Sequence, residues 1–197
     1  MTNNNLLPDN FNQEVQRTLE VLRAGGTILY PTDTIWGIGC DATNSRAVEK
    51  VYKLKQRVES KSLIILLDDM EKLSQYVEDV PEITFDLLTS IETPLTIIYS
   101  NAKNLAKNVM AADKTIAIRI VREAFCRELI KSFNKPIVST SANISNDPTA
   151  LTFNKISKEI HDKVDYVVNL YQDKLNQTKA STIIRLFESG EYTVIRK

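Results

Sequence analysis

The chain has 197 residues, of which 43 % are hydrophobic and 25 % charged, a composition that suits one globular domain with a sizeable core. Basic and acidic residues number 25 each, so no global field attracts nucleic acid or a membrane, and an anion site must come from local clustering. Cys40 and Cys126 lie far apart and His161 is the only histidine, which argues against a zinc site and for reduced, intracellular cysteines.

The sequence shows neither a membrane-spanning segment nor a signal peptide. No apolar run approaches the ~20 residues that span a bilayer. Residues 1–10 form a polar tip without the cationic start and apolar stretch of a signal peptide. We therefore expect a cytoplasmic protein with no membrane partner.

Helical periodicity begins after the polar tip. Apolar residues at positions 11, 15, 19 and 22 predict a first helix, which Asp9 or Asn10 can cap and Gly25-Gly26 ends. Further helices are expected at residues 45–55, 70–77, 82–91, 123–133 and 153–163. Strands are expected at residues 27–30, 63–67, 95–99, 115–121, 136–140 and 166–170, before a hairpin of residues 182–187 and 192–196.

This alternation of helices and strands predicts an α/β fold. The terminal hairpin and the irregular spacing favour a mixed sheet of parallel and antiparallel strands over a purely parallel one. No linker rich in Gly, Pro or Ser divides the chain, so residues 1–197 are expected to form a single domain.

The first polar segment at a strand end runs from Pro31 to Asp41 and contains threonines, a carboxylate, glycines and the only tryptophan, Trp36. Ligands of α/β sheets bind at such strand ends. Hydroxyls and glycine amides can hold a polar ligand while Trp36 covers its apolar part. The alternative, which composition alone favours, is a strand–turn–strand whose polar residues satisfy their own turn. A P-loop is excluded because GxxxxGK[ST] is absent.

The second segment is a cluster of cations: Lys50, Lys53, Lys55, Arg57 and Lys61. Lys50 and Lys53 suit a solvated helix face. The other three lie on the connection to the next strand, where charge-assisted hydrogen bonds could grip a triphosphate. Because acidic residues dilute the cluster, charge alone leaves both interpretations open.

Two further groups complete the polar set. Small hydroxyl residues from Ser139 to Asn143 can bind phosphate oxygens or a carboxylate, or can simply cap a helix or an Asx turn. Arg119 interrupts an apolar strand, an expensive place for a charge unless it meets an anion or projects from the strand end. Ser181-Thr182 and Arg196 also fit ordinary strand and terminal positions.

Together these segments resemble the YrdC family, the threonylcarbamoyl-adenylate synthases. The resemblance covers residues 25–196 and keeps the order of the motifs YPTDTIWGIGCDA, KLKQRVESKSLIIL, IAIRIV, PIVSTSANIS and STIIR. It implies a twisted mixed sheet with flanking helices and a large concave face, on which ATP and threonine would sit.

The resemblance also implies the residues of the site. Contacts to L-threonine correspond to Thr34, Arg119, Ser139 and Ser181. Nucleotide contacts correspond to Arg57, Lys61, Thr115, Ser141, Asn143, Thr149 and Arg196. Lys55, Arg57 and Lys61 are the expected catalytic cations, and Lys55 and Asn143 would support the phosphates and the loop.

In the implied reaction, the threonine amine attacks bicarbonate or CO₂, and the resulting carbamate attacks the α-phosphate of ATP. The products are threonylcarbamoyl-AMP and pyrophosphate. Such chemistry needs positioned reactants and neutralised charge rather than a nucleophilic side chain. Mg²⁺ is expected with ATP, without a protein metal site or a permanently bound cofactor. Expected partners are tRNA threonylcarbamoyl transferase proteins, with tRNA or double-stranded RNA as a candidate ligand.

Three departures from the family pattern bear on activity. Many members have proline where Val58 and Ser62 stand, histidine at the position of Leu66, and glycine at that of Asn146. Leu66 would line the threonine pocket differently, whereas Asn146 can adopt the left-handed conformation that glycine favours. The extra C-terminal domain of longer members is not expected, because the chain ends soon after Arg196.

Two alternatives to the synthase remain. The first is a catalytically divergent paralogue that binds double-stranded RNA or tRNA, although zero net charge argues against strong nonspecific RNA affinity. The second is a relative that handles carbamoyl phosphate, as the similar domain of hydrogenase maturation proteins does. The zinc-finger and acylphosphatase regions of those longer chains are not seen in this sequence.

Overall fold

The computed structural model describes residues 7–56, 63–145, 147–173 and 180–197. Its helices are α1 (Phe11–Arg23), α2 (Ser45–Lys55), α3 (Leu73–Tyr76), α4 (Ile83–Ser90), α5 (Ala124–Phe133) and α6 (Lys158–Lys163), with 3₁₀ turns η1 (Met70–Lys72) and η2 (Phe153–Lys155). Its strands are β1 (Ile28–Tyr30), β2 (Gly37–Gly39), β3 (Ile64–Leu67), β4 (Leu95–Tyr99), β5 (Ile116–Ile120), β6 (Ile137–Ser141), β7 (Tyr166–Val167), β8 (Thr182–Leu186) and β9 (Tyr192–Arg196). None of the described helices combines the length and the apolar character that a membrane span requires.

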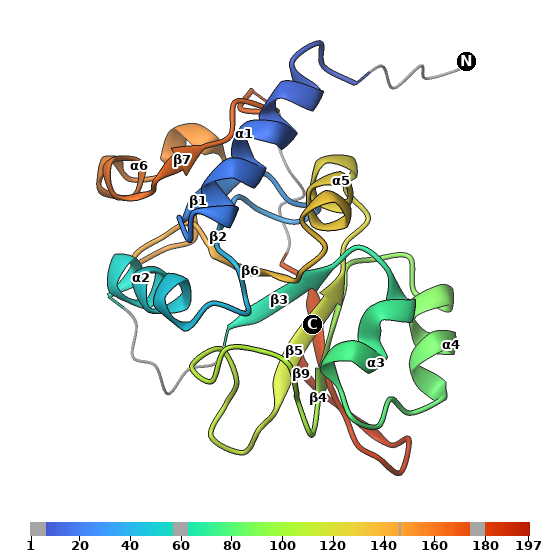
Figure 1. Cartoon of the computed structure of the whole chain (residues 1–197). Coiled ribbons are helices and arrows are strands. Elements are labelled where there is room, and N and C mark those ends of the chain that lie inside the picture. Colours follow the sequence, from blue (N-terminus) through green and yellow to red (C-terminus); the bar gives the residue numbers. More distant parts are fainter. Residues whose placement is uncertain (1–6, 57–62, 146, 174–179) are drawn as a thin grey trace, which may run out of the picture.

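The described strands form one sheet in the order β7-β1-β2-β6-β3-β5-β4-β8-β9 (Figure 1). The pairs β1/β7, β3/β5 and β4/β8 are parallel, and the other neighbouring strands are antiparallel. Both the mixed α/β sheet and the terminal hairpin predicted from the sequence are thereby confirmed.

The central strands separate two apolar clusters. Side chains alternate between the two faces of a strand. Ile65 of β3 and Ile118 of β5 accordingly belong to the larger cluster, together with the apolar residues of α2. Leu66 of β3 faces the other way and packs with the apolar stripes of α1 and α5. These two helices lie side by side in Figure 1 and cover only part of their face of the sheet.

The part of this face that α1 and α5 leave open carries a row of residues in register. Ser139 of β6 lies opposite Ile64 of β3, which lies opposite Ala117 of β5, which in turn lies opposite Ile98 of β4. Next to this row Arg119 lies between Leu66 and Thr96. The sheet therefore presents an apolar strip beside a buried cation.

Strand β2 forms the antiparallel partner of β1 that the strand–turn–strand interpretation predicted. Gly39 permits this arrangement, because a Cβ atom there would lie 2.6 Å from the carbonyl oxygen of Val138 and 2.7 Å from the ring of Tyr30. Such distances are far below van der Waals contact. The glycine is thus required for the close approach of β1, β2 and β6.

Some predicted boundaries are wrong. The single helix expected over residues 153–163 is split, because Ile156 and Ser157 are extended and the Ile156 side chain is buried in the core. Asn10 occupies the N-cap position of α1, but its amide donates to the carbonyl of Asn169 instead of capping the helix. Tertiary contacts override local propensity at both places.

Candidate active site

A cavity of about 280 Å³ opens over the uncovered part of the sheet. Its apolar wall is formed by Ile64, Ala117 and Ile98, the residues that the register aligns. Six residues of the predicted site line it: Thr34, Arg119, Ser139, Ser141, Ser181 and Arg196. Segments that are far apart in the sequence thus contribute to one cavity with polar residues and an apolar wall.

The turn after β1 places the hydroxyl of Thr34 in this cavity. Thr32 Oγ1 donates to the carbonyl of Ile35 (2.7 Å) and lies 3.0 Å from Thr34 Oγ1. Because Thr32 has one proton to donate, Thr34 supplies the proton of the shared bond. The lone pairs of Thr34 Oγ1 can then accept a hydrogen bond from a ligand. The turn therefore satisfies its own polar groups, as the strand–turn–strand interpretation predicted, and it leaves an acceptor at Thr34.

Arg119 is buried at the edge of the cavity and forms an ion pair with Asp33. Its Nη2 lies 3.1 Å from Asp33 Oδ1, and the two side chains are 4 % and 12 % exposed. Of the two alternatives that the sequence left open for this charge, an anionic partner or a position at the strand end, the structure shows an anionic partner, Asp33. Arg119 Nε and Asp33 Oδ1 are both buried and have no hydrogen-bond partner among the described residues, so the contact between the two side chains is an ion pair without an aligned hydrogen bond.

Strand β8 begins with a second polar group. Ser181 Oγ lies 2.7 Å from Thr96 Oγ1, and both residues are almost fully buried. Arg196 donates from Nη2 to the carbonyl of Ser181 (2.8 Å) and also reaches its hydroxyl (3.3 Å). Burial, and then the neighbouring Arg119, lower the pKa of Arg196. Two guanidinium groups close enough to repel each other favour an anion between them.

Ser139 lies at the opposite side of the cavity, on β6. Its neighbour Tyr30 is fully buried and donates a hydrogen bond to the carbonyl of Val138 (3.0 Å). Burial raises the pKa of Tyr30, and the hydrogen bond from Ser139 partly offsets this. Tyr30 therefore stays a neutral donor at ordinary pH, and it supports the strand that carries Ser139.

Sequence comparison connects this site to known proteins. A sequence model of the Sua5/YciO/YrdC family, described as telomere recombination, matches residues 20–197. The chain belongs to this family. It is 34 % identical over 158 residues to the threonylcarbamoyl-AMP synthase of Pseudoalteromonas translucida, which covers 79 % of this chain and 84 % of that relative.

Two solved structures of the Sua5/YciO/YrdC family share the fold. Sua5 of P. abyssi complexed with L-threonine matches with a TM-score of 0.82 and 24 % identity, over 92 % of this chain and 53 % of the Sua5 chain. YciO of E. coli matches with a TM-score of 0.81 and 23 % identity, over 94 % of this chain and 89 % of YciO. This chain thus spans about half the length of the Sua5 chain and most of the length of YciO.

Lys55 does not lie on the connection where the sequence placed it. It is the last residue of α2 and is 1 % exposed. Its Nζ donates to the carbonyls of Ser141 (2.5 Å) and Asn143 (2.6 Å), and its own carbonyl accepts from the amide of Ser145 (2.8 Å). This geometry corresponds to support of the Ser-Ala-Asn loop rather than to direct contact with a phosphate. Lys50 and Lys53, which face Asp165 and Glu49, behave as surface residues.

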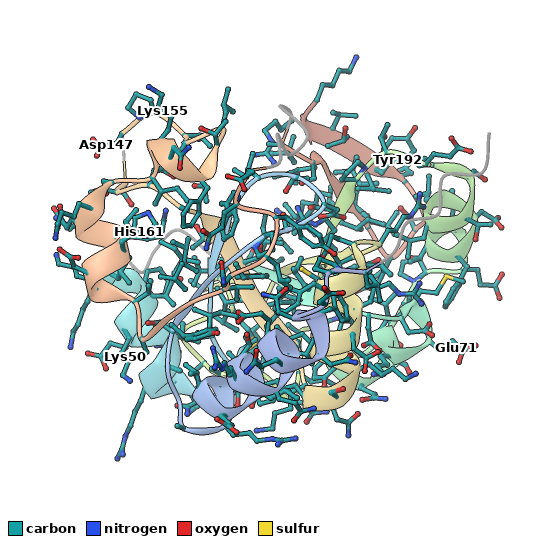
Figure 2. The ribbon with its side chains drawn as sticks, turned by 90° about the horizontal axis from the view of Figure 1, so that it is seen from above. Lys50, Glu71, Asp147, Lys155, His161 and Tyr192 are labelled. Carbon is teal, nitrogen blue, oxygen red and sulfur yellow. The ribbon has the colours of Figure 1, made fainter. Side chains whose placement is uncertain are left out.

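Other predicted nucleotide contacts lie outside the first cavity. Asn143 and Thr149 line a second hollow of about 650 Å³ on the far side of the Ser-Ala-Asn loop. Asp147 and Lys155 belong to the same hollow and lie at the opposite end of the molecule from Tyr192 (Figure 2). Thr115 donates to Asp113 Oδ1 (2.7 Å) and does not line either hollow. Arg57 and Lys61, with Val58, Ser62 and Asn146, lie outside the described residues.

Leu66 does not line the cavity, so the expectation that it reshapes the threonine pocket is wrong. It is fully buried under α1 and α5, whereas Ile64, two residues earlier on the same face, lines the wall. Trp36 also differs from the prediction, because its fully buried ring packs on Phe153 with a centroid distance of 4.7 Å. It forms part of the wall and is not an exposed cover for a ligand.

Sequence reasoning missed Asp33 and Thr96 as partners of site residues. Asp33 stands inside the first polar segment, but no local signal pairs it with Arg119. Thr96 is the one polar residue of the strand Leu95–Tyr99. A buried hydroxyl in an apolar strand calls for a partner, so this position was a usable signal.

Proposed function

We propose that this chain is an L-threonylcarbamoyladenylate synthase, which forms threonylcarbamoyl-AMP and pyrophosphate from L-threonine, bicarbonate or CO₂, and ATP. The observation that carries the proposal is the cavity in which Thr34, Arg119, Ser181 and Arg196 meet. The name of the curated relative, at 34 % identity over most of both chains, supports the same activity. The structure of P. abyssi Sua5 complexed with L-threonine supports threonine as the amino acid.

The cavity suits threonine through complementary groups. Arg119 offers its free Nε to the carboxylate, and Thr34 offers an acceptor to the amine or the hydroxyl. Ala117 leaves room for the methyl group at the apolar wall. The described lining holds guanidinium groups and no carboxylate, which suits the anionic carbamate better than an ammonium group.

The nucleotide is expected at the Ser-Ala-Asn loop, which separates the two hollows. Ser141 and Arg196 face the first hollow, and Asn143 and Thr149 face the second. Lys55 holds this loop from behind through the two carbonyls. Arg57 and Lys61 remain proposed phosphate contacts from the basic segment. The protein would then act by positioning the carbamate oxygen against the α-phosphate and by neutralising charge.

Mg²⁺ is expected to arrive with ATP. Among the described residues no cluster of three or more His, Cys, Asp or Glu could hold a metal ion. Mg²⁺ commonly binds substrate phosphates with few protein ligands, so it would reach the site as magnesium–ATP. We further propose a cytoplasmic location, transfer of the product to a tRNA threonylcarbamoyl transferase, and no permanently bound cofactor.

Pyrophosphate release from ATP and Mg²⁺ tests this function when threonine and bicarbonate are omitted in turn. We expect release only when both are present, together with threonylcarbamoyl-AMP detected by mass spectrometry. Release that is indifferent to threonine would overturn the synthase assignment. Double-stranded RNA binding with a steep salt dependence, in a protein without such release, would support the RNA-binding paralogue instead.

A further inference from the structure

The two residues of the Asp33–Arg119 ion pair differ in whether they line the cavity. Arg119 lines the cavity, whereas Asp33 lines a separate hollow of about 180 Å³ between β5 and the end of α4. The two residues of the ion pair therefore border different hollows. The contact joins Asp33 Oδ1 to Nη2, and Nε remains without a partner among the described residues.

We propose that Asp33 is a positioning residue, which holds the guanidinium of Arg119 in place for the carboxylate of the amino-acid substrate. This inference rests on the proposed function, because it assigns Asp33 a part in threonine binding. A planar guanidinium recognises a carboxylate by two parallel donors, and that geometry requires a fixed plane.

Nothing else in the described surroundings of Arg119 fixes this plane as firmly. Its strand neighbours are Leu66, which is apolar, and Thr96, whose hydroxyl lies 2.7 Å from that of Ser181. Arg196 is a second cation and cannot serve as an acceptor. Among the described residues, Asp33 is thus the anion that pairs with Arg119.

A competing role for Asp33 predicts the opposite change in the KM for threonine. If the carboxylate only neutralised Arg119, its removal would leave a buried cation that attracts an anionic ligand more strongly. If it positions Arg119, its removal weakens threonine binding in spite of the extra positive charge. The sign of the change in the KM for threonine therefore separates the two roles.

The test compares Asp33→Ala and Asp33→Asn with wild type by steady-state pyrophosphate release. We expect Asp33→Ala to raise the KM for L-threonine about tenfold or more, with the KM for ATP within about twofold. Asp33→Asn should lose less, because it keeps the size of the side chain and places the partial negative charge of an amide oxygen beside Arg119. An unchanged or lowered KM for threonine in folded Asp33→Ala would overturn the proposal.

A double-mutant cycle identifies the route of the effect. In an Arg119→Ala background, Asp33→Ala should have no further effect on threonine binding, since it acts through the guanidinium. An additive effect would overturn the positioning role. Asp41→Ala is the matched control, because Asp41 is also buried in this segment and pairs with Lys135 at 3.0 Å, away from the cavity. It should leave the KM for threonine unchanged.

Calorimetric titration with L-threonine in the absence of ATP separates this proposal from the proposed function. Threonine binding that depends on Asp33, without pyrophosphate release, would overturn the synthase and support the positioning role. Threonine-dependent pyrophosphate release, together with threonine binding that does not depend on Asp33, would overturn the positioning role and support the synthase. The NMR signals of the Arg119 guanidinium give a check that needs no ligand, because restricted rotation about its C–N bonds should be lost in Asp33→Ala.

Discussion

The two faces of β5 differ in what they bury, although both are shielded from water. Ile116 and Ile118 are 0 % and 2 % exposed and belong to the larger apolar cluster. Ala117 and Arg119, on the other face, are 8 % and 4 % exposed and line the cavity. Burial alone therefore does not distinguish core from site. The distinction is that one face packs against side chains and the other keeps a hollow and an unpartnered donor.

This difference separates stability from binding within a single strand. On a close-packed face, a substitution that removes a methylene group leaves a cavity and lowers the stability of the protein. A face that borders a hollow has less packing to lose, and substitutions there change the shape and charge that a ligand meets. Substitutions along β5 should thus alternate in effect, residue by residue.

The largest effect on activity is expected for Arg119→Ala. Removing one member of a buried charge pair or a ligand contact costs about 2–5 kcal/mol, so kcat/KM for threonine should fall about 30-fold or more. Arg185→Ala is the control, because Arg185 has a 40 % exposed side chain that pairs with Asp113 outside the cavity. Steady-state pyrophosphate release measures both, and a loss below threefold for Arg119→Ala would contradict the assignment of this face.

Ile118→Ala tests the other face of the same strand. It should lower the free energy of unfolding by about 2–5 kcal/mol, because the side chain is buried in the main cluster and its removal leaves a cavity. Urea titration measures the loss. The KM for threonine of the folded fraction should stay within about twofold of wild type. A large change in this KM with unchanged stability would reverse the roles of the two faces.

Ala117→Val narrows the cavity without removing a contact. The register places Ala117 between Ile64 and Ile98, and valine is well suited to a strand. We expect the free energy of unfolding to change by less than about 1 kcal/mol, while the added methyl groups weaken substrate binding about tenfold. The substrate affinity of Ala117→Ser, which adds less bulk, should fall between that of the wild type and that of Ala117→Val. Equal activity of all three proteins would show that the substrate does not approach this wall.

The sequence predicted these faces to different extents. Hydrophobic periodicity predicted the helices, the strands and the mixed sheet, because it reports which residues are shielded from water. The motifs predicted the family, which is confirmed, and the function that its curated relatives carry in their names. Arg119 in an apolar strand predicted an anionic neighbour or a position at the strand end, and the structure shows the anionic neighbour, Asp33.

The rest depends on contacts between distant segments. Which acid meets Arg119, and whether Leu66 or Ile64 reaches the cavity, is decided by where α1 and α5 end on the sheet. No local sequence pattern shows where these two helices end on the sheet. Likewise Lys55 looked like an exposed cation in the sequence, but the Ser-Ala-Asn loop folds over it and supplies two carbonyl acceptors.

The smallest expected effect concerns the pH dependence of stability just beyond β5, at Glu123. Burial raises the pKa of this carboxyl above its ordinary value of 4.5, with Asp33 adding to the shift. The folded protein then binds a proton more tightly than the unfolded chain does, so the unfolded state holds fewer protons as pH rises from about 4.5. The stability from Glu123 is consequently present at low pH and lost as pH rises through the raised pKa.

Glu123→Gln removes this titration while retaining a side-chain oxygen that can cap α5, where Glu123 now accepts from the amides of Phe125 and Cys126. Urea unfolding between pH 4.5 and 7 should show the wild type losing stability relative to Glu123→Gln as pH rises, by less than the loss in Ile118→Ala. Glu159→Gln supplies the opposite sign below about pH 4.5, because the partner Lys163 lowers the pKa of Glu159, so the wild type loses this contribution as pH falls. Parallel curves for wild type and Glu123→Gln would mean that Glu123 does not titrate with a raised pKa in the folded protein, and thus that burial and Asp33 do not affect it.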